Sequence, residues 1–300
     1  MVFQLPNQAP YQLGHTRKYS AYFRLTLDRS QEKSAHLQCR ARMCYNPGKE
    51  VRNVQKRGLS QEGLKLIACI TMLLDHIGAV VVMACFENST GANKGALLDL
   101  YEILRMIGRI AFPIYCFLLA EGAVHTQNPK RYALRLLIGA ALSEIPYDLA
   151  LYGGISLAHQ SVMVTLLLGF MMLCVMKKCG RLIWKLLVVV PFAAAAQLLH
   201  TDYGANGILV IALFFLTRDS SWSEILQLFG LWCIFSPNHL MALNWLCHGF
   251  TLTVQELATL AIVPITLYNG RKAMGSKAVQ WAFYLFYPAH LLALYFFDIM

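Results

Sequence analysis

An acid and a histidine stand side by side in the middle of an apolar run of the sequence. Residues 64–86 read LKLIACITMLLDHIGAVVVMACF, which is long enough to cross a bilayer, and Asp75 and His76 lie near the centre of this run. An aspartate at such depth costs about 2.5–3.5 kcal/mol on insertion scales, so it persists only where partners or water receive it. We therefore take His76 as the leading candidate for chemistry, and Asp75 as the acid that supports it or orients a neighbouring helix.

Further ionisable residues lie in the other apolar runs. His290 is near the middle of the last run, so two histidines are expected at similar depth. Arg105 and Arg109 are four residues apart and share one helix face, and the same spacing recurs on the next helix in Glu144 and Asp148. We expect these two cations and two carboxylates to neutralise one another, as a low-dielectric interior requires.

A histidine at this depth has a definite chemistry. A neutral imidazole accepts a proton from an attacking amine or hydroxyl and returns it to a leaving group, and a nearby carboxylate fixes its tautomer. Arginines beside it hold phosphate or carboxylate groups through paired hydrogen bonds. The set suits group transfer from an anionic donor and equally suits proton-coupled transport, and a structural ion-pair network that only holds helices together is a third reading.

The composition is that of a membrane protein. Of the 300 residues, 57% are hydrophobic and 14% are charged, which is more apolar surface than one water-soluble core can bury. The formal charge of +10 comes from the N-terminal segment and from alternate loops, a distribution that orients membrane proteins, so no nucleic acid is expected as a partner. No His-x3-His or Glu-x2-His pair stands on a predicted helix, so no metal site is expected.

The apolar runs predict an all-α, polytopic integral membrane helix bundle of about nine transmembrane helices. Basic residues cluster in alternate loops, and the opposite loops, one of which is 239–253, carry only Lys94 among lysines and arginines. The positive-inside rule then makes the N-terminus cytoplasmic. The predicted helices cover residues 64–86, 103–122, 131–152, 161–178, 182–200, 205–217, 222–238, 254–268 and 279–298.

The first sixty residues differ from the rest of the chain. Residues 1–60 are polar and basic and lack the continuous apolar core of a signal peptide. We expect a disordered cytoplasmic tail here, which leaves residues 61–300 as the transmembrane domain. At the other end, the aromatic residues of the last run are expected to face lipid and neighbouring helices. These residues are Trp281, Phe283, Tyr284, Phe286 and Tyr287.

Several runs resemble the TraX family, which is named for the conjugative F-pilin acetylation protein. The resemblance extends in order over residues from about 60 to 300, and the family is similar to the wider group of transmembrane acyltransferases that includes the acyltransferase-3 proteins and heparan-α-glucosaminide N-acetyltransferase. The matching runs are LKLI (64–67), TMLLDHIG (71–78), LRMIGRIAFPIYCFLLAEG (104–122), SEIPYDL (143–149), TLLLG (165–169), TDYGA (201–205) and FYPAHL (286–291).

The resemblance implies a multi-pass acetyltransferase of the inner, cytoplasmic cell membrane. Such an enzyme moves acetyl from cytoplasmic acetyl-CoA to an amine or hydroxyl on the outer side, on a protein N-terminus or a saccharide. It makes His76 the base or acyl-relay residue, with Asp75 and His290 in the same catalytic group. Substrate binding is expected from Arg105, Arg109, Glu144, Asp148 and Asp202, and binding of the CoA nucleotide from Lys130, Arg131 and Arg135 or from the alternative basic cluster Lys177, Lys178 and Arg181. A proton-coupled transporter is the alternative, and a non-catalytic membrane scaffold comes third.

Overall fold

The structure, a computed structural model, describes residues 58–90, 93–156, 158–236, 254–271 and 277–299. The chain divides into two units, Met1–Lys56 and Arg57–Met300, and every described residue belongs to the second unit. In these residues the chain is helical and forms no strand, which confirms the all-α class for this part. Nearly all of the predicted tail and the whole of the predicted loop 239–253 lie outside the described residues.

The first predicted run folds as a helix with a π-helical segment inside it. α2 spans Gln61–Ile77, the π-helical segment η1 covers Gly78–Val82, and α3 continues over Met83–Asn88. π-helical turns are rare and occur frequently at functional sites. This one directly follows Asp75 and His76, the pair that the sequence singles out.

The second predicted run, 103–122, is two helices instead of one. α4 spans Asn93–Gly108 and α5 spans Ala111–His125, with a turn at residues 109–110 between them. Pro113 has no backbone N–H to donate to the fourth residue before it, so the helical hydrogen bonds cannot run through this point. The prediction of one uninterrupted helix here is therefore wrong, and Arg109 lies at the break.

The remaining helical elements follow the order of the predicted runs and overlap each of them. The prediction of helices is confirmed, whereas the number of membrane crossings stays a prediction. These elements are α6 (Pro129–Tyr152), α7 (Val162–Met176), α8 (Leu182–Leu198), α9 (Gly204–Thr217), α10 (Ser223–Phe235), the 3₁₀-helix η2 (Val254–Ala261), α12 (Ile262–Thr266) and α13 (Lys277–Ile299).

Local signals fix the ends of the helices that carry the candidate site. The Ser60 hydroxyl caps α2 by accepting the backbone N–H of Gly63 at 3.1 Å. α6 begins in the same way, because the Asn128 side chain accepts the N–H of Arg131 at 3.1 Å and proline occupies the first helical position. α6 ends at Gly153, whose φ of 70° is the left-handed conformation that favours glycine.

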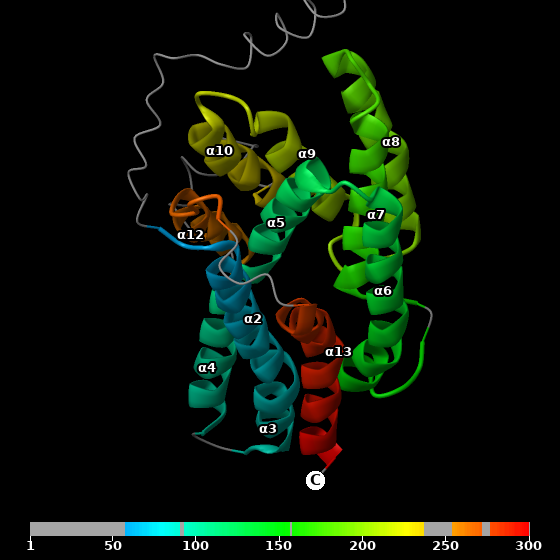
Figure 1. The fold of residues 1–300 in the computed structure, drawn as a ribbon. Coiled ribbons are helices and arrows are strands. Elements are labelled where there is room, and N and C mark those ends of the chain that lie inside the picture. The colour runs from blue at the N-terminus through cyan, green and yellow to red at the C-terminus, as the bar shows by residue number, and fades with distance from the viewer. Residues whose placement is uncertain (1–57, 91–92, 157, 237–253, 272–276, 300) are drawn as a thin grey trace, which may run out of the picture. The chain divides into compact units, whose positions relative to one another are not determined.

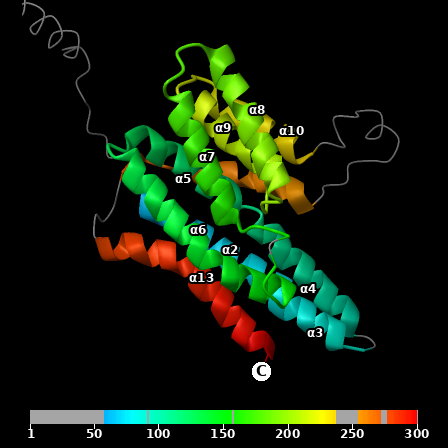
Figure 2. The ribbon, with the colours of Figure 1, turned by 90° about the vertical axis from the view of Figure 1, so that its right-hand side faces the viewer.

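Two sets of helices pack around the site. α9 lies against α5, α7, α8 and α10, and Ile208 and Ile211 on α9 are fully buried there. α13 packs along α6 and also contacts α2, and it lies beside α6 in both views (Figure 1; Figure 2). α2 in turn contacts α4 and α5. The last helix thus meets the first one, which allows residues from the two ends of the described chain to form one site.

Large apolar side chains cover much of the outer surface of this unit. On α8, for example, Leu182, Val190 and Leu198 are 61%, 63% and 79% exposed. Contiguous exposed apolar surface of this kind marks contact with a membrane or a partner. Two helical segments of the described chain are long and apolar enough to cross a membrane, Gln61–Asn88 and Asn93–His125, and several shorter apolar helices follow them.

Candidate functional site

Two buried histidines from the first and last helices are in direct contact. His76 Nδ1 lies 2.7 Å from His290 Nε2, and the two rings stack with their centroids 4.9 Å apart. Their exposed fractions are only 8% and 7%. The two histidines that the sequence pairs therefore share a hydrogen bond, while their depth in a membrane stays a prediction.

A backbone carbonyl determines which nitrogen carries the proton in each ring. His290 Nδ1 is 2.7 Å from the carbonyl oxygen of Phe286, and a carbonyl can only accept, so this nitrogen carries hydrogen. In a neutral ring, His290 Nε2 is then the acceptor, and His76 Nδ1 donates to it. The remaining nitrogen, His76 Nε2, keeps its lone pair, and no group among the described residues makes a hydrogen bond to it.

Asp75 turns to the opposite side and holds both arginines. Arg105 Nη1 donates to Asp75 Oδ2 at 2.6 Å, and Arg109 Nη2 donates to Asp75 Oδ1 at 2.7 Å. The side chains of Asp75 and Arg109 are each 12% exposed, so this is a largely desolvated cluster with a net charge of +1. Arg109 is held further by Gln255 Oε1 at 3.2 Å.

A glycine makes this close approach possible. A Cβ atom added to Gly108 would clash with Asp75 Cβ. The backbone at the end of α4 therefore passes directly against the Asp75 side chain. With any larger residue at this position, α4 would move away from α2, and the two arginines would move away from their acid.

The predicted partners of the arginines are wrong. Glu144 Oε1 accepts the Ser161 hydroxyl at 2.6 Å and its carboxylate also accepts the Ser161 backbone N–H, while Asp148 accepts the N–H of Ser156 at 2.9 Å. These two acids bind the loop between α6 and α7, and no ion pair joins them to an arginine within the described residues. The arginines bind Asp75 because its carboxylate faces α4.

A cavity of about 520 Å³ leads toward the histidine pair. Its outer end lies at the first turn of α2 and the last turn of α5. The His125 side chain lines this end and is exposed, so the cavity opens to solvent here. Its inner end is lined by Met72 and Tyr287. His76 lies one helical turn beyond Met72 and packs against Tyr287 with ring centroids 6.1 Å apart, so the histidine is next to the inner end.

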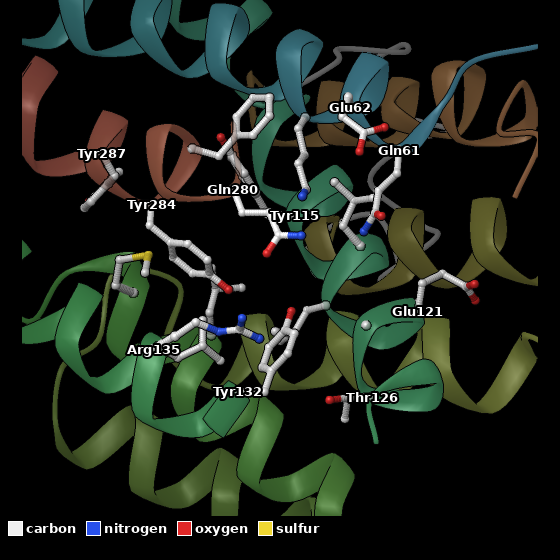
Figure 3. Close-up of a pocket in the computed structure, with 18 of the residues that line it drawn as sticks. Gln61, Glu62, Tyr115, Glu121, Thr126, Tyr132, Arg135, Gln280, Tyr284 and Tyr287 are labelled. Carbon is white, nitrogen blue, oxygen red and sulfur yellow. The ribbon is translucent and has the colours of Figure 1, made fainter. Parts of the chain in front are cut away.

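Tyrosines and a few cations line the cavity along its length. Figure 3 shows Arg135 and Tyr132 reaching in from α6, and Gln280 and Tyr284 from α13. The Arg135 guanidinium lies 5.4 Å from the centre of the Tyr132 ring, and its Nε is buried without a hydrogen-bond partner among the described residues. Lys65 of α2 also lines the cavity.

The three predicted nucleotide-binding residues have different surroundings. Arg135 lines the cavity, whereas Lys130 and Arg131 are exposed at the start of α6 and are not part of its lining. At the mouth, Glu121 accepts a 2.6 Å hydrogen bond from Arg218 Nε, and this bond raises the pKa of the Arg218 guanidinium. The Glu121 carboxylate is therefore paired with a cation, and Glu62 is a second carboxylate that lines the same end of the cavity.

On the other side of the arginine cluster the chain forms a shallow depression. It is lined by Asp202 and Tyr203 together with His159 and His200 of the neighbouring loops. The backbone N–H of Asp202 donates to the Gln160 carbonyl at 2.9 Å, which ties the loop before α9 to the loop before α7. The Tyr203 ring stacks on Phe112 at 3.6 Å, beside the arginine-bearing break. Asp202 thus lines this depression and is not part of the cavity lining.

The sequence-based interpretation missed several cavity residues. Phe283, Tyr284 and Tyr287 were expected to face lipid and neighbouring helices, but all three line the cavity. Together with Gln280 they follow a spacing of three to four residues, which places them on one face of α13. That spacing is a signal in the sequence, but aromatic residues are equally common on lipid-facing surfaces.

The fold and site define a class: a helical bundle with a buried histidine pair at the end of a deep cavity. The profile of the TraX protein family matches residues 60–298, so the chain belongs to the TraX family. A relative in Dichelobacter nodosus, named "Probable fimbrial assembly protein FimC, serogroup H1", is 28% identical over 249 residues, which cover 77% of this chain and 92% of that protein. No solved structure gives a significant match.

Proposed function

We propose that this chain is an integral membrane acetyltransferase in which His76 Nε2 is the general base. The observation that carries the proposal is the open lone pair on His76, which the hydrogen bonds through His290 to the Phe286 carbonyl leave unprotonated beside the inner end of a cavity. A neutral histidine with one nitrogen fixed and the other free is the usual form of a base in group transfer.

The proposed reaction is a single transfer from a thioester. The nitrogen or oxygen of the acceptor attacks the acetyl carbonyl carbon and gives its proton to His76 Nε2. The bond between carbonyl carbon and sulfur then breaks, and the proton passes from His76 to the departing thiolate, which gives free CoA. The bond from His76 Nδ1 to His290 steadies the positive charge on the ring during the transfer.

The cavity suits the donor. The phosphates of CoA need cations, and Lys65 of α2 and Arg135 of α6 both line the cavity. The largely apolar, tyrosine-lined interior suits the uncharged pantetheine arm, which carries the acetyl group inward to Tyr287 and His76. Of the three predicted nucleotide-binding residues, we therefore retain Arg135 as the one in direct contact.

The acceptor enters from the opposite side in this proposal. Neither Asp75 nor Asp202 lines the donor cavity, and Asp202 lies in the depression formed by the loops before α7 and α9. The relative from Dichelobacter nodosus is named for fimbrial assembly, so a pilin N-terminal amine is the acceptor that we would test first. The broad exposed apolar surface, the two long apolar segments and the alternate basic loops support a multi-pass location in the cytoplasmic membrane.

The direct experiment measures binding and turnover of labelled acetyl-CoA by the purified protein. We expect His76→Ala to bind acetyl-CoA with unchanged affinity and to transfer acetyl to a small amine about 10²–10⁴-fold more slowly than wild type, which is the usual contribution of a general base. Ile70→Ala is the control, because Ile70 lies on the same helix and is 51% exposed.

Two outcomes would contradict the proposal. Full activity of the His76→Ala variant would show that His76 is not the base. Substrate flux across proteoliposomes without any acetylated product identifies a proton-coupled transporter instead, the alternative that a buried histidine pair also suits.

A further inference from the structure

The inner end of the cavity contains a tyrosine hydroxyl that no described residue accounts for. Tyr287 is 4% exposed, lines the cavity and packs edge-on against both His76 and His290. Its hydroxyl makes no hydrogen bond among the described residues. A buried hydroxyl without a partner costs about 1–3 kcal/mol, so such a group is expected to have a role.

A helix N-terminus lies against the same hydroxyl. Val162 and Met163, the first two residues of α7, line the cavity beside Tyr287. The backbone N–H groups of a first helical turn have no partner within the helix. Ser161, which precedes α7, does not cap them because its hydroxyl donates to Glu144 instead.

The Tyr287 hydroxyl keeps its proton available beside this helix end. The Val162 backbone N–H is directed at the hydroxyl oxygen of Tyr287, although the two do not form a full hydrogen bond. The hydroxyl proton has no acceptor within the described part of the chain. A buried O–H of this kind beside a cavity is a donor for an oxygen atom that carries negative charge.

We propose that the Tyr287 hydroxyl, whose oxygen faces the Val162 backbone N–H, donates to the carbonyl oxygen of the acyl group during transfer. This inference rests on the proposed acetyltransferase function. It assigns to Tyr287 a catalytic role, stabilisation of the oxyanion, that His76 as the base does not fill. When the acceptor attacks the carbonyl carbon, one electron pair of the C=O bond moves onto oxygen, and the Tyr287 hydroxyl stabilises that oxyanion by donating its proton in a hydrogen bond. When the C–S bond breaks, the pair returns and the carbonyl re-forms.

The position of Tyr287 favours this role over substrate binding alone. Tyr287 lies between the cavity, along which the thioester arrives, and His76, which takes the proton of the acceptor. The carbonyl carbon of the thioester must come within reach of the acceptor beside His76. In this position the carbonyl oxygen faces Tyr287 and the start of α7. A donor at this place gains strength only as charge develops on oxygen, and it therefore affects turnover more than affinity.

The experiment compares Tyr287→Phe with wild type in the purified full chain, using labelled acetyl-CoA and a small amine. We expect turnover to fall about 10²–10³-fold, the usual effect of removing one oxyanion donor, with the Kd for acetyl-CoA unchanged. Tyr295→Phe, on the same helix, is the matched control and should keep full activity; the Tyr295 ring contacts Phe296 and does not line the cavity.

Each outcome decides between two claims. Unchanged turnover in Tyr287→Phe overturns the oxyanion assignment while wild-type activity upholds the acetyltransferase function. A parallel loss of turnover and acetyl-CoA affinity makes Tyr287 a binding residue and also overturns it. Absence of turnover in the wild-type protein contradicts both the proposed function and this inference.

Discussion

At the scale of single residues, the site depends on one backbone carbonyl. Phe286 accepts from His290 Nδ1, which makes His290 Nε2 an acceptor and directs the proton of His76 to Nδ1. A histidine held in this way presents its Nε2 lone pair at all times, without competition between tautomers. The second histidine is thus a positioning residue in our account, and His76 is the one that meets the substrate.

We expect His290→Ala to reduce turnover about 10²-fold or more while acetyl-CoA binding is kept. The variant removes the acceptor of the His76 proton, so the His76 ring is free to rotate and to take the other tautomer. Steady-state kinetics with labelled acetyl-CoA measures the effect. Leu292→Ala, on the same helix and 38% exposed, is the control, and a fully active His290→Ala would show that the hydrogen bond between the rings has no part in catalysis.

At the scale of elements, the contact between α2 and α4 holds the charged cluster in place. Asp75 touches the backbone at Gly108, and both arginines reach its carboxylate from the end of α4. A desolvated acid with two arginines is stable only while all three groups stay together, because breaking such a pair leaves an uncompensated charge. The distance between these two helices therefore controls the cluster.

Two variants of α4, Gly108→Ala and Gly95→Ala, test this contact between α4 and α2. The added methyl at position 108 clashes with the Asp75 side chain, and overpacking of this kind costs about 1–3 kcal/mol, so we expect a lower melting temperature in detergent. At position 95 nothing lies within 4 Å, and alanine is a better helix former than glycine, so that variant should match or slightly exceed wild type. Equal melting temperatures for the two variants would contradict the close contact.

The sequence predicted the helices better than the contacts between them. The apolar runs mark helices because their length and hydrophobicity are local properties of the chain. The spacing of Arg105 and Arg109 predicted a shared face, and both side chains do reach one carboxylate. That carboxylate belongs to Asp75 and not to the predicted Glu144 and Asp148, because spacing within a helix does not say how two separate helices are rotated toward one another.

The cavity could not be predicted for a related reason. Its lining comes from helices that are distant in sequence, α2, α5, α6, α7 and α13, and a volume between helices exists only once they are packed. Tyr287 shows the difficulty most clearly, since its place in an aromatic run fits a lipid-facing helix equally well. Only the packing of α13 against α6 and α2 turns that side chain inward.

At the scale of the whole molecule, the proposed function needs two routes that meet at His76. The cavity opens at the ends of the helices that carry the basic loops, and we propose that the donor enters there and the acceptor approaches from the side of Asp202. The positive-inside rule predicts that the basic loops lie in the cytoplasm, where acetyl-CoA is made. We therefore expect acetyl to enter from one face of the membrane and to leave on an acceptor at the other.

A sided transfer assay in proteoliposomes tests this claim most directly. Labelled acetyl-CoA is sealed on the side that carries the basic loops, and an impermeant amine or a pilin N-terminal peptide is supplied only on the opposite side. We predict that wild-type protein acetylates the outer acceptor, that Ile70→Ala does so equally well, and that His76→Ala does not, although it still binds acetyl-CoA. Labelling of the outer acceptor by His76→Ala at the wild-type rate, or product formed only when donor and acceptor share one side, would contradict the account.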